Sequence, residues 1–114
     1  MDADPHLWFG EAEPGHWMVR DRATGQEWTS PLDDPEAQPA DVAYVGRVPR
    51  SSGQLVVVAG IHAIGSVGAV DWLTTHLAEL HRDVGERPFS MLVRSEHDGL
   101  TITGSEVTCP PRIY

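Results

Sequence analysis

One segment of the sequence constrains the fold more than any other: an apolar run that leads through a glycine-rich stretch into a helical pattern. Residues 55–59 read LVVVA and do not alternate with polar residues. A run without alternation is typical of a strand that is buried on both faces. We therefore predict a central strand over residues 54–60, followed by a glycine-rich loop over residues 60–68.

The segment after this loop carries the helical pattern. Apolar residues recur at steps of three or four and form one stripe, at Val70, Leu73, Leu77, Leu80 and Val84. Ser66 is of the residue type that caps a helix N-terminus, and Gly85 is placed to end the helix. The pattern predicts one main helix over residues 66–84.

Turn residues divide much of the remaining chain into strands. Ala23-Thr24-Gly25 predicts a β-hairpin within residues 16–30, and Asp98-Gly99 predicts a second hairpin within residues 89–107. Residues 41–50 predict a further strand. The short turn after it indicates that this strand is antiparallel to the one that follows.

These elements predict a single α+β domain over residues 1–114, in which residues 1–15 form an irregular arm. The sheet is expected to be mixed and mostly antiparallel, with about six strands and the helix packed on one face. A right-handed crossover would give one parallel pair, between residues 54–60 and 89–96. The other face would be covered by the Trp-rich N-terminal region, by a partner subunit or by sequence outside this chain. We expect a homodimer.

The residue inventory excludes several classes of function. All eight basic residues are arginine and face 17 acidic residues, which gives a formal net charge of −9. Without lysine, neither Schiff-base chemistry nor a P-loop is available. The negative charge and the scattered arginines argue against direct binding of nucleic acid. The single cysteine, Cys109, has no disulfide partner within the chain, and no CxxC or HExxH motif occurs, so we expect no metal and no cofactor.

We identify neither a signal peptide nor a membrane-spanning segment in the sequence. The N-terminal residues are acidic and lack the basic and apolar regions of a signal peptide. The most apolar stretch, residues 55–70, is too short and too interrupted by glycines to span a membrane. We therefore expect a cytoplasmic protein that does not interact with membranes. The lysine-free composition, rich in Ala, Gly, Asp and Arg, suits a GC-rich actinobacterial genome.

The loop between the predicted strand and helix is the candidate site. A helix N-terminus after a sheet strand favours anions, and glycines let a ligand approach the backbone closely. The candidate ligand-binding residues are Gly60, His62, Gly65, Ser66, Gly68 and Arg94. In the alternative, the glycines serve a tight turn and helix packing, Ser66 only caps the helix, and Arg94 forms an ion pair with Glu106 or another acid.

Catalysis is the less favoured reading of the same loop. If the protein is an enzyme, His62 is the candidate general base and Ser66 the candidate hydroxyl, with Asp71 as a third member. The pattern Gly65-Ser66-Val67-Gly68 lacks the GxSxG spacing of a nucleophile elbow, so no catalytic residue is assigned.

Four segments together resemble a known family: DVAYVGRVPR, VVVAGIHAIGSVGAVDWL, HLAEL and SEVTCPP. The chain resembles, over roughly residues 4–112, the C-terminal domain of actinobacterial (Streptomyces-type) helix-turn-helix regulators of the XRE-like kind, whose function is not established. The resemblance implies a Rossmann-like effector or sensor module in a regulatory protein. This sequence contains no helix-turn-helix.

Three hypotheses follow for function. The first is a non-enzymatic sensor domain of a transcription regulator that binds a small anionic ligand at residues 60–68. The second is a protein-interaction or dimerisation module that uses the tryptophans and the uncovered sheet face. The third is a small enzyme with His62 as general base.

Overall fold

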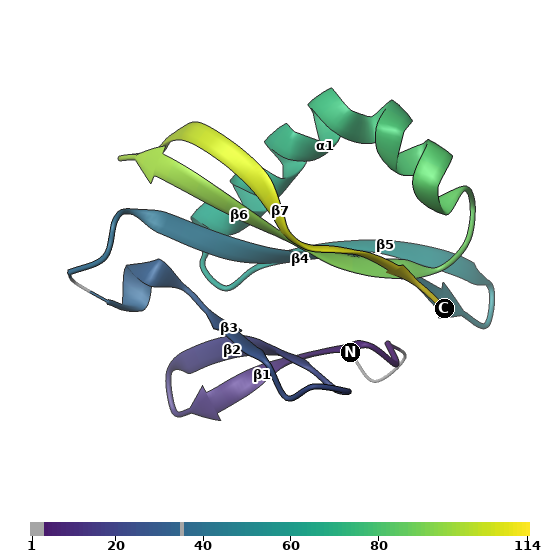
Figure 1. Ribbon diagram of the computed structural model, residues 1–114, viewed down its shortest axis with the longest axis horizontal. Coiled ribbons are helices and arrows are strands. Elements are labelled where there is room, and N and C mark those ends of the chain that lie inside the picture. Colours follow the sequence, from purple (N-terminus) through teal and green to yellow (C-terminus); the bar gives the residue numbers. More distant parts are fainter. Residues whose placement is uncertain (1–3, 35) are drawn as a thin grey trace.

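Three layers make up the fold (Figure 1). The computed structural model describes residues 4–34 and 36–114. In chain order the elements are β1 (Leu7–Glu13), β2 (His16–Asp21), β3 (Glu27–Thr29), the 3-10 helix η1 (Pro31–Asp33), β4 (Ala40–Arg50), β5 (Gly53–Gly60), α1 (Ala63–Val84), β6 (Phe89–Asp98) and β7 (Thr101–Ile113). Strands β4 to β7 form the middle layer, α1 covers one of its faces, and strands β1 to β3 cover the other.

All strand pairs in the described part of the chain are antiparallel. The N-terminal sheet has the order β1-β2-β3, and the larger sheet has the order β5-β4-β6-β7. β4 therefore occupies an inner position, paired with β5 on one side and with β6 on the other. β5 and β7 are the edges of the larger sheet.

The inner strand β4 separates two apolar cores. Side chains alternate along it, so Ala43 and Val45 face α1 while Val42 and Tyr44 face the N-terminal sheet. The core on the α1 side also contains Ala69, Trp72, Leu80, Val84, Phe89, Met91 and Val93. The core between the sheets also contains Leu7, Val19, Leu92 and Cys109. The hydrophobic effect thus holds all three layers together through β4 and its neighbour β6.

Several sequence predictions are confirmed. The class is α+β, and the two predicted hairpins are present as β2–β3 and β6–β7. Their turns contain Gly25 and Gly99, at φ of 76° and 59°, where glycine is strongly favoured. α1 ends at Val84, and Gly85, with φ of 61°, occupies the C-cap position as predicted. The strand over residues 41–50 is antiparallel to the next one, as predicted.

The prediction that residues 54–60 form a central strand is wrong. β5 lies at an edge, with Leu55 44% and Val56 61% exposed. The predicted parallel pair is wrong as well, because β4 lies between β5 and β6. The connection through α1 therefore joins two strands that run in the same direction without pairing. The sheet accordingly lacks the adjacent parallel strands of a Rossmann-like domain.

The N-terminal arm is more regular than predicted, and the last strand extends beyond the predicted hairpin. Residues 7–13 of the predicted irregular arm form β1, which pairs with β2; residues 1–3 of that arm lie outside the described residues. The C-terminal residues 109–113 belong to β7. The two prolines among these residues are compatible with an edge strand, because no further strand on the outer side requires their N–H groups.

The N-terminal sheet covers the face of the larger sheet that α1 leaves open. Trp28 and Phe9 pack against the core between the sheets. Trp72 belongs to the opposite core, and Trp17 is 44% exposed. Trp28 and Trp72 therefore belong to opposite cores, while Trp17 lies against Phe9 on the N-terminal sheet, with ring centroids 6.1 Å apart. No helix in the described residues is long and apolar enough to cross a membrane.

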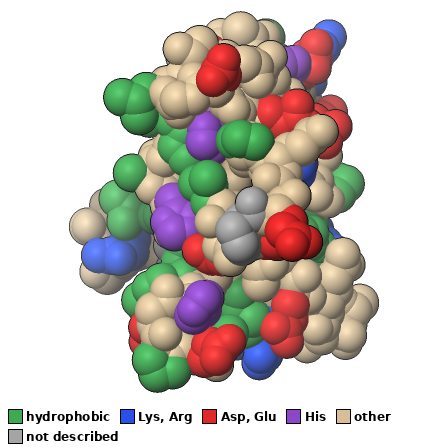
Figure 2. Space-filling model, turned by 90° about the vertical axis from the view of Figure 1, so that its left-hand side faces the viewer, with side chains coloured by type: hydrophobic (Ala, Val, Ile, Leu, Met, Phe, Trp, Pro, Cys, Tyr) green, Lys and Arg blue, Asp and Glu red, His purple; other side chains and the backbone are tan. Residues whose placement is uncertain are grey.

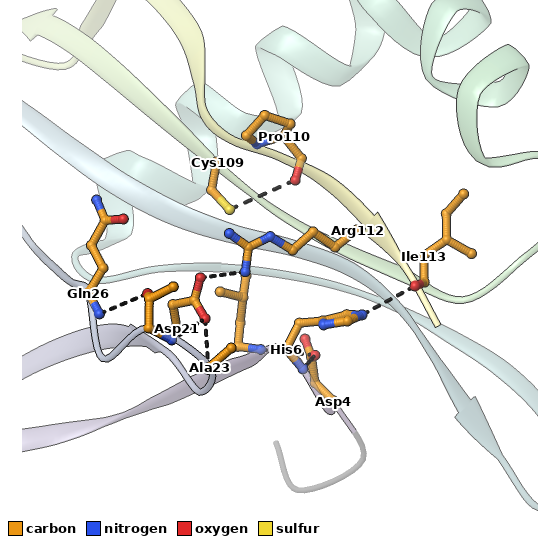
Figure 3. Close-up of polar contacts among 11 residues, drawn as sticks. Asp4, His6, Asp21, Ala23, Gln26, Cys109, Pro110, Arg112 and Ile113 are labelled. Atoms are coloured by element: carbon orange, nitrogen blue, oxygen red, sulfur yellow. Dashed lines mark hydrogen bonds and ion pairs between the residues drawn. The ribbon is translucent and has the colours of Figure 1, made fainter.

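Polar contacts also join the two sheets, among them the one between Asp21 and Arg112 in Figure 3. The Tyr44 hydroxyl donates to Asp4 Oδ2 at 2.7 Å, and the other Asp4 oxygen accepts from the backbone N–H groups of His6 and Leu7. Burial, together with the hydrogen bond to Asp4, raises the pKa of Tyr44, so the phenol stays protonated and remains a donor. These bonds fix the segment from Asp4 to Leu7 against β4.

A second contact links β2 to β7. The Arg112 guanidinium donates to Asp21 Oδ2, while Asp21 Oδ1 accepts from the backbone N–H groups of Ala23 and Thr24. The hydrogen bond from Arg112 is the largest cause that lowers the pKa of Asp21, from 3.8 to about 2. The ionised carboxylate is therefore stabilised in the folded protein.

This contact makes the stability of the protein sensitive to acid. Since the folded protein holds the pKa of Asp21 below its unfolded value of 3.8, the contribution is complete above about pH 4 and falls as pH decreases towards 2. In Arg112→Gln the Asp21 carboxylate loses the hydrogen bond from the guanidinium. The free energy of unfolding of this variant should therefore depend less on pH over that interval than that of the wild type. Urea unfolding at several pH values measures the difference between wild type and variant, which we expect to shrink as pH falls.

Arg20→Gln is the matched control, because its ion pair with Glu27 joins side chains that are 45% and 46% exposed. Its difference from wild type should stay small at every pH. A constant cost for Arg112→Gln between about pH 5 and pH 2 would contradict the assigned role of Asp21.

Candidate functional site

The loop between β5 and α1 is built around a buried carboxylate. Asp41, the second residue of β4, is fully buried, and its Oδ2 accepts from the backbone N–H groups of His62 at 2.8 Å and Gly65 at 2.9 Å. The Ile61 N–H group donates to the Val42 carbonyl at 2.9 Å. Carboxylates are favourable at helix N-termini, where backbone N–H groups lack partners. Asp41 thus fixes the start of α1 against β4.

The prediction that Ser66 caps the helix is wrong, and so is the predicted helix start. α1 begins at Ala63, and the cap position falls on His62, whose side chain makes no capping hydrogen bond. The Ser66 hydroxyl instead accepts from the backbone N–H of Gly60 at 2.8 Å. It ties the end of β5 to the first turn of the helix, while Asp41 supplies the acceptor that a local cap would have provided.

The three glycines of the candidate site allow close packing. A Cβ at Gly65 would lie 2.4 Å from Asp41 Oδ2, and one at Gly68 would lie 2.0 Å from Ser95 Oγ. A Cβ at Gly60 would lie 2.2 Å from the His62 carbonyl oxygen. These distances leave no room for a side chain, so the glycines let the helix approach the sheet. This matches the structural alternative that the sequence left open.

The side chain of His62 points to a different partner from the one that catalysis requires. Its Nε2 lies 2.8 Å from Asp33 Oδ1 in η1, and 42% of the side chain is exposed. The Ser66 hydroxyl contacts Gly60 rather than this ring. Asp71 lies exposed further along α1. The arrangement therefore does not assemble His62, Ser66 and Asp71 as a triad.

The structure does not bring Arg94 to the loop. Arg94 pairs with Val42 in the register of β4 and β6, so it shares the face that is turned away from α1. Its Nη1 donates to Glu96 Oε1 at 3.0 Å. This matches the structural alternative, an ion pair with Glu106 or another acid, and the acid is Glu96.

The backbone N–H groups at this loop converge as they would in an anion site, but the group that they bind is the carboxylate of Asp41. A free anion would have to replace Asp41 at the N–H groups of His62 and Gly65. Acidic and histidine side chains are spread over the end of the molecule shown in Figure 2, which includes η1 and the turn between β6 and β7. Acidic surroundings disfavour the approach of an anion. Binding of a small anionic ligand at residues 60–68 stays a prediction.

Other reactive groups in the described residues are held in unreactive forms or lie apart. Burial raises the pKa of the Cys109 thiol, which disfavours the nucleophilic thiolate. No group of three or more His, Cys, Asp or Glu side chains within residues 4–34 and 36–114 comes together as a metal site.

Two surfaces emerge that the sequence reasoning missed. One is the free edge of β5, whose eight residues include neither a charge nor a proline. The other is a groove of about 680 Å³ beside the C-terminal half of α1, lined by Arg47, Thr74, Thr75, Leu77, Ala78 and His81. The apolar run at residues 55–59 was the available signal for the first surface, but such a run is also typical of a central strand. The groove had no local signal, because it joins α1 to β4.

In comparisons with known proteins, no family model, no curated protein and no solved structure matches this chain.

The packing of Asp41 against Gly65 is testable by a double-mutant cycle. Gly65→Ala would stabilise an ordinary helix interior by roughly 1 kcal/mol, but here the methyl group meets the buried carboxylate. We expect it to lower the free energy of unfolding by about 2 kcal/mol. Asp41→Ala should cost a similar amount, about 2 kcal/mol, because two backbone donors lose their acceptor.

The double variant should lose less than the sum of the two, since Asp41→Ala removes the group with which the new methyl collides. Denaturant unfolding of all four proteins gives the coupling free energy. Simple additivity would contradict the contact, and a stabilising effect of Gly65→Ala alone would contradict the close approach of helix and sheet.

Proposed function

We propose that the protein is a self-association module in which β5 pairs with β5 of a second copy. The observation that carries this proposal is the difference between β5 and the other sheet edges. An exposed strand edge presents unpaired N–H and C=O groups, and proteins usually protect such edges with charges, prolines, bulges or short strands. β5 has eight residues, pairs regularly with β4 along its length and has none of these protections.

The other three edges of the described structure are protected. β3 has three residues and begins with Glu27. β1 has a register shift between Glu11 and Glu13. β7 contains two prolines and several register shifts. β5 therefore stands out as the edge at which a further strand is accepted.

Exposed apolar side chains accompany this edge. On β5 itself, Leu55 is 44% and Val56 61% exposed. On α1, Val70 is 50% and Leu77 is 62% exposed. Val56 lies on the α1 side of the sheet and Leu55 on the opposite side, so exposed apolar side chains flank the edge on both faces, as is common at interaction surfaces. Burial of these side chains would add to the hydrogen bonds of a new strand pair.

A second copy fits this edge because β5 is complementary to itself. In a two-fold antiparallel pairing, residues 55–58 of each copy lie opposite apolar residues of the other. Each copy has a formal net charge of −9, so the two repel one another at long range. A strand without charge is where such chains meet at the lowest electrostatic cost.

Val56→Lys tests the proposal. The side chain is 61% exposed, so the change should leave the monomer folded. In the paired state two like charges meet near the two-fold axis, and we expect dimerisation to weaken by about tenfold or more. Analytical ultracentrifugation over a concentration series measures the effect. Lysine reduces the net negative charge, so greater long-range repulsion cannot explain a loss of association.

Leu100→Lys is the matched control. Leu100 is 90% exposed in the turn between β6 and β7, away from β5. It should self-associate at least as well as wild type. A wild-type protein that stays monomeric at every concentration, or a Val56→Lys protein that dimerises normally, would overturn the proposal.

Salt gives a further check on the same interface. Because each copy carries −9, raising the ionic strength screens mutual repulsion and should strengthen dimerisation. An interface held by ion pairs would weaken instead. Sedimentation of the wild-type protein at low and high sodium chloride distinguishes the two cases.

A further inference from the structure

The groove beside α1 arises from uneven packing of the helix on the sheet. Near its N-terminus, Gly65 and Gly68 let the helix lie directly on β4 and β6. Further along, the large side chains of Trp72 and Leu80 fill the interface. Figure 1 shows the helix arching over the sheet. The groove of about 680 Å³ lies at this C-terminal half, and its volume falls in the range of small-molecule sites.

The groove has a lining of unusual charge for this chain. The chain has 17 acidic and eight basic residues, yet the lining contains Arg47 and His81 and no acidic residue. Arg47 forms no ion pair within the described residues, so its charge remains available to an anion. The sign of the groove is thus opposite to that of the whole protein.

Arg47 is held in place for such a role. Its Nη1 donates to the Gly85 carbonyl at 2.8 Å, and its Cζ lies 5.8 Å from the centroid of the Phe89 ring. A guanidinium has five N–H donors, so the bond to Gly85 leaves others for a ligand. Fixed, planar donors suit the two oxygens of a carboxylate.

The helix end limits the charge of the ligand. Arg47 contacts the C-terminal end of α1, where the helix dipole is negative and offsets part of the arginine charge. A monoanion is therefore favoured over a doubly charged phosphate group.

Apolar surface lies next to this charge. Leu77 lines the groove and is 62% exposed. Val56 is the register partner of Arg47, so the two lie side by side on the same face of the sheet, and Val56 is 61% exposed. An apolar tail would cover both side chains while the head group reaches Arg47.

We propose that this groove binds a small monocarboxylate with an apolar tail, its carboxylate on Arg47 and its tail along Leu77 and Val56. The inference rests on Arg47 and the charge of the lining, and it does not require self-association at β5.

Titration with octanoate, below the concentration at which it forms micelles, tests the site. Two-dimensional NMR of the full chain should show saturable shifts at Val56, Leu77 and Ala78. Octanol should bind at least about tenfold more weakly, because it cannot form the charged hydrogen bonds, and octylamine should not bind at this site. Titrations at two protein concentrations separate binding from any change in association.

Two variants test where the carboxylate and the apolar tail of the ligand bind. Arg47→Gln should weaken octanoate binding by about tenfold or more, whereas Arg50→Gln, at the exposed end of β4, should bind as wild type. Leu77→Ser should also weaken binding, with Leu100→Ser as its unaffected match. Because Leu77 is exposed, this variant keeps the test decisive even if Arg47→Gln is less stable.

Two results would overturn the inference. One is the absence of saturable shifts at the groove. The other is a lack of selection for the carboxylate by the Arg47 charge. Equal binding of octanoate and octanol, or equal weakening of octanoate binding by Arg47→Gln and Arg50→Gln, would show this.

Discussion

The buried carboxylate of Asp41 is the interaction on which the arrangement of the larger sheet and helix depends. It lies at the start of the inner strand β4 and accepts hydrogen bonds from two backbone donors at the beginning of α1. A helix N-terminus leaves backbone donors without partners, and Asp41 Oδ2 accepts from two of them. The other oxygen, Asp41 Oδ1, is buried without a hydrogen-bond partner in the described residues, so the contact with the helix start is made through Oδ2 alone.

The remaining geometry follows from this anchor. The chain leaves β5, passes over β4 at the Asp41 contact and returns through α1 to β6, so β4 is enclosed and β5 is left outside. Close contact at Gly65 and Gly68 sets the helix on the sheet at one end. Larger side chains separate them at the other end, where the groove lies. The free edge and the groove are thus both consequences of how one helix crosses one strand.

Features set by nearby residues were predictable from the sequence. The turns at Gly25 and Gly99 and the helix end at Gly85 need a backbone conformation that glycine adopts readily, and each was located correctly. The apolar stripe of α1 also gave the helix, because helical spacing is local.

Features set by distant residues were not predictable in the same way. Ser66 has the right residue type for a cap, but the acceptor comes from Asp41, more than twenty positions earlier in the chain. Arg94 was placed near the loop, although strand register turns it to the other face of the sheet. The run at residues 55–59 does contact both cores, through Val57 and Val58, which explains its lack of alternation. Alternation reports burial of the faces of a strand and carries no information about its edges.

This distinction between faces and edges bears on how the protein assembles. A chain with two open edges on one sheet can add copies at both and grow into a fibre. Here β5 is open, whereas β7 at the opposite edge contains Pro110 and Pro111, which have no N–H to donate, and its pairing with β6 is irregular. Two-fold pairing of β5 uses the open edge of both copies and leaves only protected edges outside. The proposed pairing therefore predicts a closed dimer, because it would use the open edge and leave outside only the edge that stops growth.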